Sequence, residues 1–234
     1  MLINKEKCIG CRNCIPYCPV NAIKFRDKKA VIELDECVEC GVCERAQVCP
    51  TDAIYRQELE WPRTIRYIMS DVLSIAEESQ ISGRGTEEMK TNELTNRFTR
   101  GEAGVGIEVG RPGVATRMHD VDTISRALAE LDIEYEKCNP VTSMMSDPDK
   151  GIFKDVLLDE RVLSAILEFK VPNEKIPRLI EILEEVEKEI DTVFSLDLIC
   201  RVEEDDTLPA IEIADELTWV SINGKTNIGI GRAN

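Results

Sequence analysis

Alternating apolar positions predict β-strands in three stretches of this chain. The first stretch lies within residues 101–113, and the others cover residues 162–171 and 192–202. In the first stretch, the positions expected to face inward are Val105, Ile107 and Val109. Three glycines fall on the opposite face, at Gly104, Gly106 and Gly110. Because glycine in a strand marks the close approach of another group, we expect a helix to pack there, in preference to a bound ligand.

Patterns with the period of a helix lie between and before these strands. Apolar residues recur on one face over residues 61–78, where Pro62 occupies a first-turn position that needs no backbone N–H. Two further helices are predicted over residues 120–131 and 174–189. Their expected N-cap residues are Asp120 and Asn173.

The elements of the C-terminal part follow the order β-α-β and then β-α-β, once a short strand over residues 133–138 is included. This order predicts a ferredoxin-like, split βαβ sandwich with its helices on one face of the sheet. Residues 219–230 carry an Asn-Gly turn typical of a two-residue hairpin. In outline the topology is similar to that of ACT-like domains that sense small molecules. A polar stretch over residues 80–101, in which residues 91–94 can begin a short helix, is either functional or disordered.

Eight of the ten cysteines lie in two runs near the N-terminus. The first run reads C-x2-C-x2-C-x3-C-P, and the second has the same order with five residues before its last cysteine. The first consists of Cys8, Cys11, Cys14 and Cys18, and the second of Cys37, Cys40, Cys43 and Cys49. The spacing is the ligand signature of bacterial ferredoxins with four-iron clusters. Three closely spaced cysteines can bind three iron corners of a cubane, but so tight a loop cannot reach the fourth.

Residues 2–57 resemble a bacterial-type two-cluster ferredoxin, which carries two 4Fe-4S clusters. The two runs repeat at an offset of 29 residues, and both continue as Cys-Pro-x-Asn/Asp-Ala-Ile. The resemblance implies a pseudo-symmetric βαββαβ fold in which the fourth cysteine of each run ligates the other cluster. Carried onto this chain, one cluster is bound by Cys8, Cys11, Cys14 and Cys49. The other is bound by Cys37, Cys40, Cys43 and Cys18. The apolar wall around them includes Ala22, Ile23, Ala53 and Ile54.

Other uses of these cysteines are less consistent with the pattern. Structural zinc sites use pairs of C-x2-C, but they need neither a third cysteine nor a Cys-Pro ending. Disulfides require an oxidising compartment. No aspartate replaces the second cysteine of either run, which favours two four-iron clusters over a three-iron variant. The longer gap in the second run, residues 44–48, departs from the family spacing and leaves the potential of that cluster open.

Composition narrows the class of protein. The N-terminal residues lack the apolar core of a secretory signal, and no apolar stretch approaches the roughly 20 residues of a membrane helix. The formal net charge of −16 over 234 residues argues against nucleic-acid binding, which depends on Lys and Arg. Because exposed four-iron clusters are sensitive to oxygen, we expect a cytoplasmic protein of an anaerobe.

The charge is unevenly distributed along the chain. Residues 1–55 contain eight basic and eight acidic residues, whereas residues 153–217 contain nineteen acidic and seven basic ones. A small basic cluster lies between the two cysteine runs and consists of Lys24, Arg26, Lys28 and Lys29. Such a cluster can face an acidic partner, although a solvated turn is the favoured interpretation.

The rest of the sequence offers little further chemistry. Cys138 and Cys200 are expected to be structural thiols, and His119 to lie at the surface before a helix cap. Gly224-Lys225-Thr226 lacks the upstream glycine of a phosphate-binding loop, and the acidic run at residues 203–206 is typical of a solvated turn. We therefore predict no catalytic residues.

The sequence predicts an α+β protein with a dicluster ferredoxin domain over residues 1–57. Residues 58–102 form a connecting helix and polar loop, and residues 103–234 form the ferredoxin-like, ACT-like sandwich with its C-terminal hairpin. The predicted function is the transfer of single low-potential electrons to or from a partner oxidoreductase, with the C-terminal domain docking or regulating.

Two other functions stay open at this point. In one, the C-terminal domain binds a small effector and forms a homodimer, which makes the protein a redox or ligand sensor. In the other, the chain is itself an oxidoreductase with its substrate near Gly83-Arg84-Gly85 or Arg111. The lack of a flavin or nicotinamide motif argues against the second.

Overall fold

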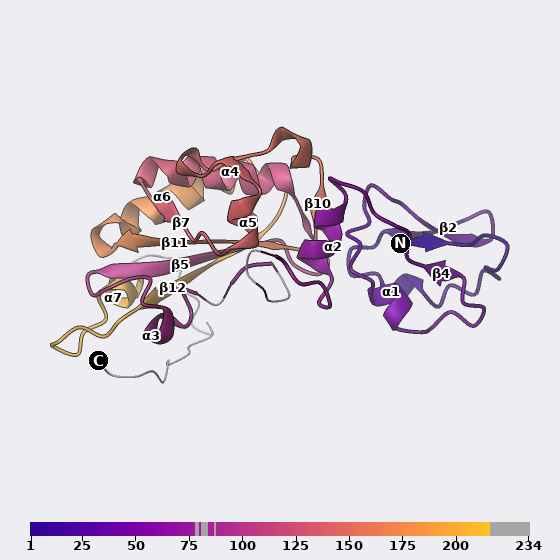
Figure 1. Cartoon of the computed structure of the whole chain (residues 1–234), viewed down its shortest axis with the longest axis horizontal. Helices are drawn as coiled ribbons and strands as arrows, with labels where there is room; N and C mark the ends of the chain where they lie inside the picture. Colours follow the sequence, from indigo (N-terminus) through magenta and orange to yellow (C-terminus); the bar gives the residue numbers. More distant parts are fainter. Residues whose placement is uncertain (78–79, 81–83, 87, 216–234) are drawn as a thin grey trace.

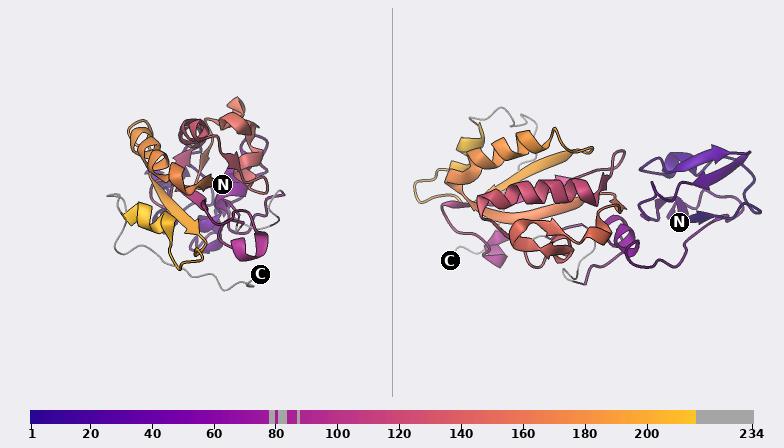
Figure 2. Two further views of the ribbon diagram at one scale, coloured as in Figure 1. Left: turned by 90° about the vertical axis from the view of Figure 1, so that its left-hand side faces the viewer. Right: turned by 90° about the horizontal axis from the view of Figure 1, so that it is seen from above.

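A computed structural model of the chain describes residues 1–77, 80, 84–86 and 88–215. Figure 1 shows two units side by side along the long axis of the molecule, with the N-terminal unit at one end. The right-hand view in Figure 2 shows the same separation from above. The predicted hairpin over residues 219–230 lies outside the described residues.

The N-terminal unit is built from two small two-stranded sheets. Strand β1 (Leu2–Ile3) pairs with β4 (Ile54–Tyr55), and β2 (Ile23–Arg26) pairs with β3 (Lys29–Ile32), both antiparallel. Along the chain, the 3-10 helix η1 (Ile15–Tyr17) lies between β1 and β2, and the helix α1 (Val42–Arg45) lies between β3 and β4. Asp27 and Lys28 both have positive φ, as the two-residue turn of a right-twisted hairpin requires. The order is βαββαβ with a 3-10 turn as its first helix.

The C-terminal unit has a four-stranded antiparallel sheet in the order β12-β5-β11-β7. Its strands are β5 (Glu102–Val109), β7 (Glu134–Tyr135), β11 (Ala165–Pro172) and β12 (Phe194–Cys200). The helices α4 (Met118–Leu128) and α6 (Ile176–Val186) cover one face, whereas the short helix α3 (Asn92–Thr95) lies on the other side in Figure 1. The core between sheet and helices contains the inward side chains of β5 and β11 and the apolar stripes of α4 and α6.

Shorter elements complete this unit. The paired strands are β6 (Thr116–Arg117) with β10 (Arg161–Val162) and β8 (Met145–Asp147) with β9 (Ile152–Phe153). The remaining α-helices are α2 (Thr64–Ser70), α5 (Pro140–Ser143) and α7 (Pro209–Asp215). The 3-10 turns are η2 (Ala129–Leu131), η3 (Pro148–Lys150), η4 (Asp155–Leu157) and η5 (Asn173–Lys175).

The helix predicted over residues 61–78 is much shorter in the structure. Helix α2 ends at Ser70, and Asp71 has an extended backbone. The Asp71 carboxylate accepts hydrogen bonds from the side chains of Arg45 and Arg56 and from the backbone N–H of Leu73, which pulls the chain away from the helix axis. Val72 and Leu73, predicted to lie on the apolar stripe, are 68% and 66% exposed.

Both predicted N-caps are also wrong. Helix α4 begins at Met118 with Arg117 as its N-cap, so His119 lies in the first turn of the helix and Asp120 follows it. The Asp120 carboxylate accepts a hydrogen bond from the backbone N–H of Asp191 instead. Asn173 begins the 3-10 turn η5, and its buried side-chain oxygen has no hydrogen-bond partner among the described residues.

Among the described residues, the nearest neighbours of the strand glycines in β5 come from a loop and a strand. A Cβ atom on Gly104 would collide with the ring of Phe98, which is 1% exposed and follows α3 in the chain. Gly106 lies opposite Asp197 of β12, and Gly110 lies beyond the end of the strand with a positive φ. The close approach was predicted correctly at Gly104, but an aromatic ring from a loop makes it.

Candidate metal centres

Four cysteines from both runs line one pocket in the N-terminal unit. This first pocket contains Cys8, Cys11, Cys14 and Cys49, together with Ile3, Ile9, Ala30, Ala53 and Ile54. The loop that carries the first three cysteines turns sharply, because Gly10 and Arg12 both have left-handed backbone conformations. A Cβ atom on Gly10 would overlap the carbonyl oxygen of Lys28, so the β2–β3 turn lies directly against this loop.

The other four cysteines line a second pocket. Its thiols belong to Cys18, Cys37, Cys40 and Cys43, and its apolar residues are Met1, Val20, Ala22, Ile23, Ile32 and Val38. The loop from Cys37 to Cys43 also has left-handed residues, at Glu39 and Gly41. In both pockets the fourth cysteine comes from the other run. The eight cysteines singled out in the sequence are therefore brought together in two groups of four.

Two cysteine sulfurs accept backbone hydrogen bonds at equivalent positions of the repeat. The N–H of Ala22 lies 3.0 Å from Cys18 Sγ, and the N–H of Ala53 lies 3.2 Å from Cys49 Sγ. Such donors stabilise negative charge on a metal-bound thiolate. Burial by itself would raise the pKa of Cys49, but the N–H groups of Ala53, Thr51 and Ile54 hold this pKa below its usual value.

The second pocket is the more buried of the two. Burial raises the pKa of Cys43 to about 12 and also raises the pKa values of Cys37 and Cys40. In the first pocket, burial raises the pKa of Cys14, whereas Cys11 is exposed to solvent. Metal binding to these thiols must release protons, because the thiolate is the ligand. Two apolar pockets with four thiols each suit two cubane clusters.

Comparison with known proteins agrees with this geometry. Residues 7–53 match the family of 4Fe-4S dicluster domains. Ferredoxin 7Fe of Hydrogenibacillus schlegelii is 38% identical to this chain over 66 residues, which are 26% of this chain and 82% of that protein. Through its N-terminal region, the chain belongs to the dicluster ferredoxin family. It carries two 4Fe-4S clusters and has an iron–sulfur electron-transfer role.

Other relatives are longer than the region that they share with this ferredoxin. Pyruvate synthase subunit PorD of Methanothermobacter marburgensis is 46% identical over 52 residues, which are 22% of this chain and 58% of that subunit. A ferredoxin of Mycolicibacterium smegmatis is 42% identical over 55 residues, which are 23% of this chain and 50% of that protein. The chain thus spans just over half of the first protein and half of the second.

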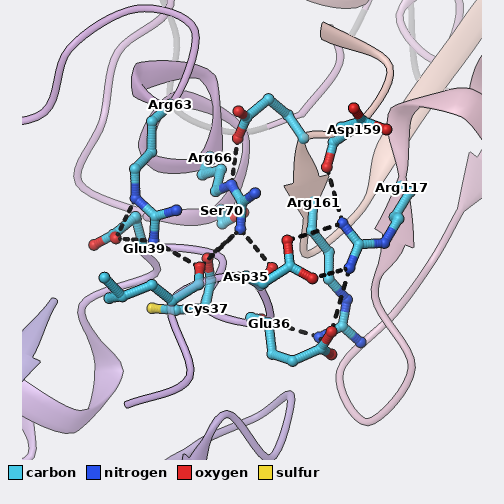
Figure 3. Close-up of polar contacts among 12 residues, drawn as sticks. Asp35, Glu36, Cys37, Glu39, Arg63, Arg66, Ser70, Arg117, Asp159 and Arg161 are labelled. Atoms are coloured by element: carbon cyan, nitrogen blue, oxygen red, sulfur yellow. Dashed lines mark hydrogen bonds and ion pairs between the residues drawn. The ribbon is translucent and has the colours of Figure 1, made fainter.

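The loop that leads into the second pocket is held by arginines from outside the ferredoxin domain. Figure 3 shows Arg66 of α2 against the loop at residues 34–37. Its guanidinium donates to the carbonyl oxygens of Leu34, Asp35 and Cys37 at 3.2, 2.7 and 3.0 Å, and it forms an ion pair with Glu160. The Arg66 side chain is 5% exposed, so these bonds form away from water.

Two more arginines bind the acidic residues of the same loop. Arg117 of β6 reaches Asp35 at 2.7 Å and Glu36 at 3.2 Å, and Arg161 of β10 reaches Glu36 at 2.5 Å (Figure 3). Through its hydrogen bond, Arg117 lowers the pKa of Asp35. The two strands that pair with each other thus present both arginines to one loop.

Glu39 is a buried carboxylate beside the second pocket. It is 1% exposed and pairs with the N-terminal ammonium of Met1. It also pairs with Arg63 at 2.6 Å (Figure 3). Burial alone would raise the pKa of Glu39, but these two cations hold it below its usual value. The N-terminus of the chain is therefore fixed beside the residues that line this pocket.

The remaining candidates lie apart from the pockets. Cys200 on β12 packs against the core of the C-terminal unit, and Cys138 lies 3.7 Å from the guanidinium of Arg97. Glu203 and Glu204 bind the backbone of Gly101 and the side chain of Arg100. Residues 81–83 and 224–226 lie outside the described part of the chain. Within the described residues, no helix is long and apolar enough to cross a membrane.

The sequence analysis did not predict that arginines bind the 34–39 loop. They lie at four scattered positions, Arg63, Arg66, Arg117 and Arg161. Arg161 and its partner Glu36 are 125 residues apart, so no local pattern connects them. The balance of charge gave no signal either, because residues 1–55 contain eight basic and eight acidic residues.

Proposed function

We propose that Cys8, Cys11, Cys14 and Cys49 hold one 4Fe-4S cluster and that the second pocket's four cysteines hold the other. The observation that carries this proposal is the exchange of fourth cysteines, since Cys49 lies in the first pocket and Cys18 in the second. When bound, each cluster takes up and releases one electron. The chain supplies the thiolates, the apolar walls and the N–H donors to sulfur.

The cross-ligation can be tested with two matched serine variants. Cys49→Ser is expected to alter the electron paramagnetic resonance signal of the cluster bound by Cys8, Cys11 and Cys14 and to leave the other signal intact. Cys18→Ser is expected to do the reverse. Iron and sulfide analysis of the anaerobically purified full chain gives the cluster content of each variant. If Cys49→Ser alters the cluster of its own run instead, the ligand assignment is wrong.

The protein is proposed to exchange low-potential electrons with a partner oxidoreductase. Reduction adds negative charge to a cluster, and burial of that charge in an apolar pocket lowers the potential. The similarity to a pyruvate synthase subunit supports an oxidoreductase as partner. Anaerobic affinity purification from the native host, followed by mass spectrometry, tests this. Recovery of a stoichiometric oxidoreductase subunit is the expected result, and recovery of the iron-loaded chain alone contradicts it.

The C-terminal unit is proposed to dock the ferredoxin domain to its partner oxidoreductase or to regulate that partner. The arginines that reach from α2, β6 and β10 to the 34–39 loop hold the two units together, as such docking requires. A sensor function, with an ACT-like effector site and a homodimer, remains a prediction from topology. It requires saturable binding of a small metabolite to the full chain and a dimer in sedimentation experiments.

A further inference from the structure

The ferredoxin domain contacts the rest of the chain on one side only. Within the described residues, hydrogen bonds and ion pairs from this domain to residues beyond 60 involve the following positions: Pro19, Leu34, Asp35, Glu36, Cys37, Glu39, Arg45 and Arg56. Both Pro19 and Cys37 line the second pocket. The second pocket is therefore the one that faces the C-terminal unit.

The first pocket keeps an open face. Cys11 is exposed, and Ile9, which lines the pocket beside it, is 64% exposed. Tyr17, in the short turn after Cys14, is 45% exposed. Exposed apolar and aromatic side chains at a reactive centre are typical of the centre of a protein interface, which is surrounded by a polar rim.

The contacts with the C-terminal unit also pair several acids of the ferredoxin domain with arginines, whereas most of its basic residues have no carboxylate partner in the described structure. Of its eight acids, Asp35, Glu36 and Glu39 form ion pairs with arginines beyond residue 60. Glu44 and Glu33 pair with Arg56 and Arg26. The acids outside these ion pairs are Glu6, Asp27 and Asp52. The basic residues without a carboxylate partner in the described structure are Lys5, Lys7, Arg12, Lys24, Lys28 and Lys29.

Most of these basic residues belong to segments that border the first pocket. Lys5 and Lys7 lie three residues and one residue before Cys8, and Lys29 donates a hydrogen bond to the Cys8 carbonyl oxygen. Arg12 lies within the cysteine run, with its guanidinium 3.9 Å from the centre of the Phe25 ring. The carbonyl of Lys28 is in contact with the same loop. Of the three unpaired acids, Glu6 lies between Lys5 and Lys7, Asp27 precedes Lys28, and Asp52 lies between the pocket residues Thr51 and Ala53. These segments thus carry five cations against three acids, so the charge around the first pocket has a positive excess.

We propose that this face, made of Ile9 and Cys11 with a rim of Lys5, Lys7, Arg12 and Lys28, is the docking surface for an acidic redox partner. The partner is a protein whose own electron-exchange site is surrounded by Asp and Glu carboxylates. This inference rests on the electron-transfer function proposed above. Complementary charge steers association and raises its rate by about 10- to 1,000-fold at low salt. The overall charge of −16 would otherwise repel such a partner.

The test uses two cobalt(III) complexes as one-electron oxidants of the reduced full chain. Tris(oxalato)cobaltate is a trianion and hexaamminecobalt is a trication, so they respond in opposite ways to local charge. Oxidation is followed by stopped-flow absorbance between about 0.01 and 0.15 M salt, over which screening shortens from roughly 30 to 8 Å. If the basic face is the exchange surface, oxidation by the trianion slows several-fold as salt rises. If the overall charge of the protein governs the rate, oxidation by the trianion accelerates as salt rises.

Two triple variants with equal net charge locate the effect. Lys5→Glu, Lys7→Glu and Lys28→Glu together are expected to reverse the salt dependence for the trianion. The matched control, Lys137→Glu, Lys150→Glu and Lys188→Glu, changes three exposed lysines of the C-terminal unit and is expected to leave it unchanged. Equal effects of the two variants would overturn the docking surface. If the wild-type chain contains no reducible clusters, the electron-transfer function itself is contradicted instead.

Discussion

Replacing Arg66 by methionine is expected to weaken the contact between the second cluster pocket and the C-terminal unit and to destabilise the protein. The guanidinium is 5% exposed and donates to three carbonyl oxygens of the loop at residues 34–37. Methionine fills a similar volume but has no donor, so those carbonyl groups lose their partner. Glu160, whose side chain is 14% exposed, also loses the cation with which it pairs.

The size of the effect follows from this burial. Removing one partner of a buried ion pair costs about 3–5 kcal/mol, because the other charge stays buried without compensation. In a protein of this size, each kcal/mol lowers the melting temperature by about 2–4 °C. We therefore expect the melting temperature of the Arg66→Met variant to fall by roughly 6–20 °C in anaerobic scans at one fixed rate.

A double variant separates this electrostatic cost from lost packing. Glu160→Met alone is expected to destabilise the protein in the same way, because it leaves the Arg66 cation without its partner. The double variant, Arg66→Met with Glu160→Met, is expected to lose less than the sum of the two single losses, since neither charge then remains unpaired. Additive losses would mean that the ion pair contributes nothing beyond packing.

The clusters give an independent measurement on the same variant. Within the described part of the ferredoxin domain, the hydrogen bonds of Arg66 all go to the loop of the second pocket. The second cluster is therefore expected to disappear first on mild heating, as counted by electron paramagnetic resonance. Arg178→Met is the control, because this arginine is 44% exposed and its ion pairs lie on the surface. Its loss is expected to leave the melting temperature almost unchanged, because exposed ion pairs contribute little to stability. Equal losses in the two variants, or simultaneous loss of both clusters, would refute the reasoning.

Two further changes test other features of the structure. Gly41→Ala is expected to destabilise the protein more than Gly101→Ala. Both glycines have positive φ, but only a Cβ on Gly41 meets other side chains, those of Arg45, Arg56 and Asp71. Comparable melting temperatures of the two variants would contradict this contact. Burial raises the pKa of Glu168, which accepts hydrogen bonds from Thr86 and Asn139. The stability that this raised pKa contributes is complete below about pH 4.3, the usual pKa of Glu. It is lost as pH rises through the folded-state value. From pH 5 upward, the melting temperature should therefore decline more in the wild type than in Glu168→Gln, and parallel profiles would contradict this.

Local spacing was enough to predict the two cysteine runs and the main strands. Three cysteines within seven residues must lie on one loop, and the three stretches of alternating apolar residues contain the strands β5, β11 and β12 over most of their length. These features depend on neighbours within a few residues of one another. The sequence therefore contains them directly, and the structure places them where the pattern indicates.

Interactions between distant residues explain most of what the sequence did not predict. The helix expected to reach residue 78 ends at Ser70 because the Asp71 carboxylate is bound by Arg45 and Arg56, which come from the ferredoxin domain. Its apolar stripe continues in the sequence, yet Val72 and Leu73 are exposed. Helical periodicity cannot predict such an end, since the energy comes from charges 15 and 26 residues away.

The longer gap in the second cysteine run can now be related to this contact between domains. In the first run, the residues between Cys14 and Cys18 form the 3-10 turn η1. In the second run, the longer gap includes the end of helix α1, and this end carries Arg45. Arg45 donates to both oxygens of Asp71 at 2.8 Å and to the carbonyl oxygen of Cys40 at 2.6 Å. One side chain therefore connects a cysteine of the second pocket with the segment that follows α2. The added residues leave the four thiols of this pocket together, and they break the symmetry of the repeat on the side where the C-terminal unit binds.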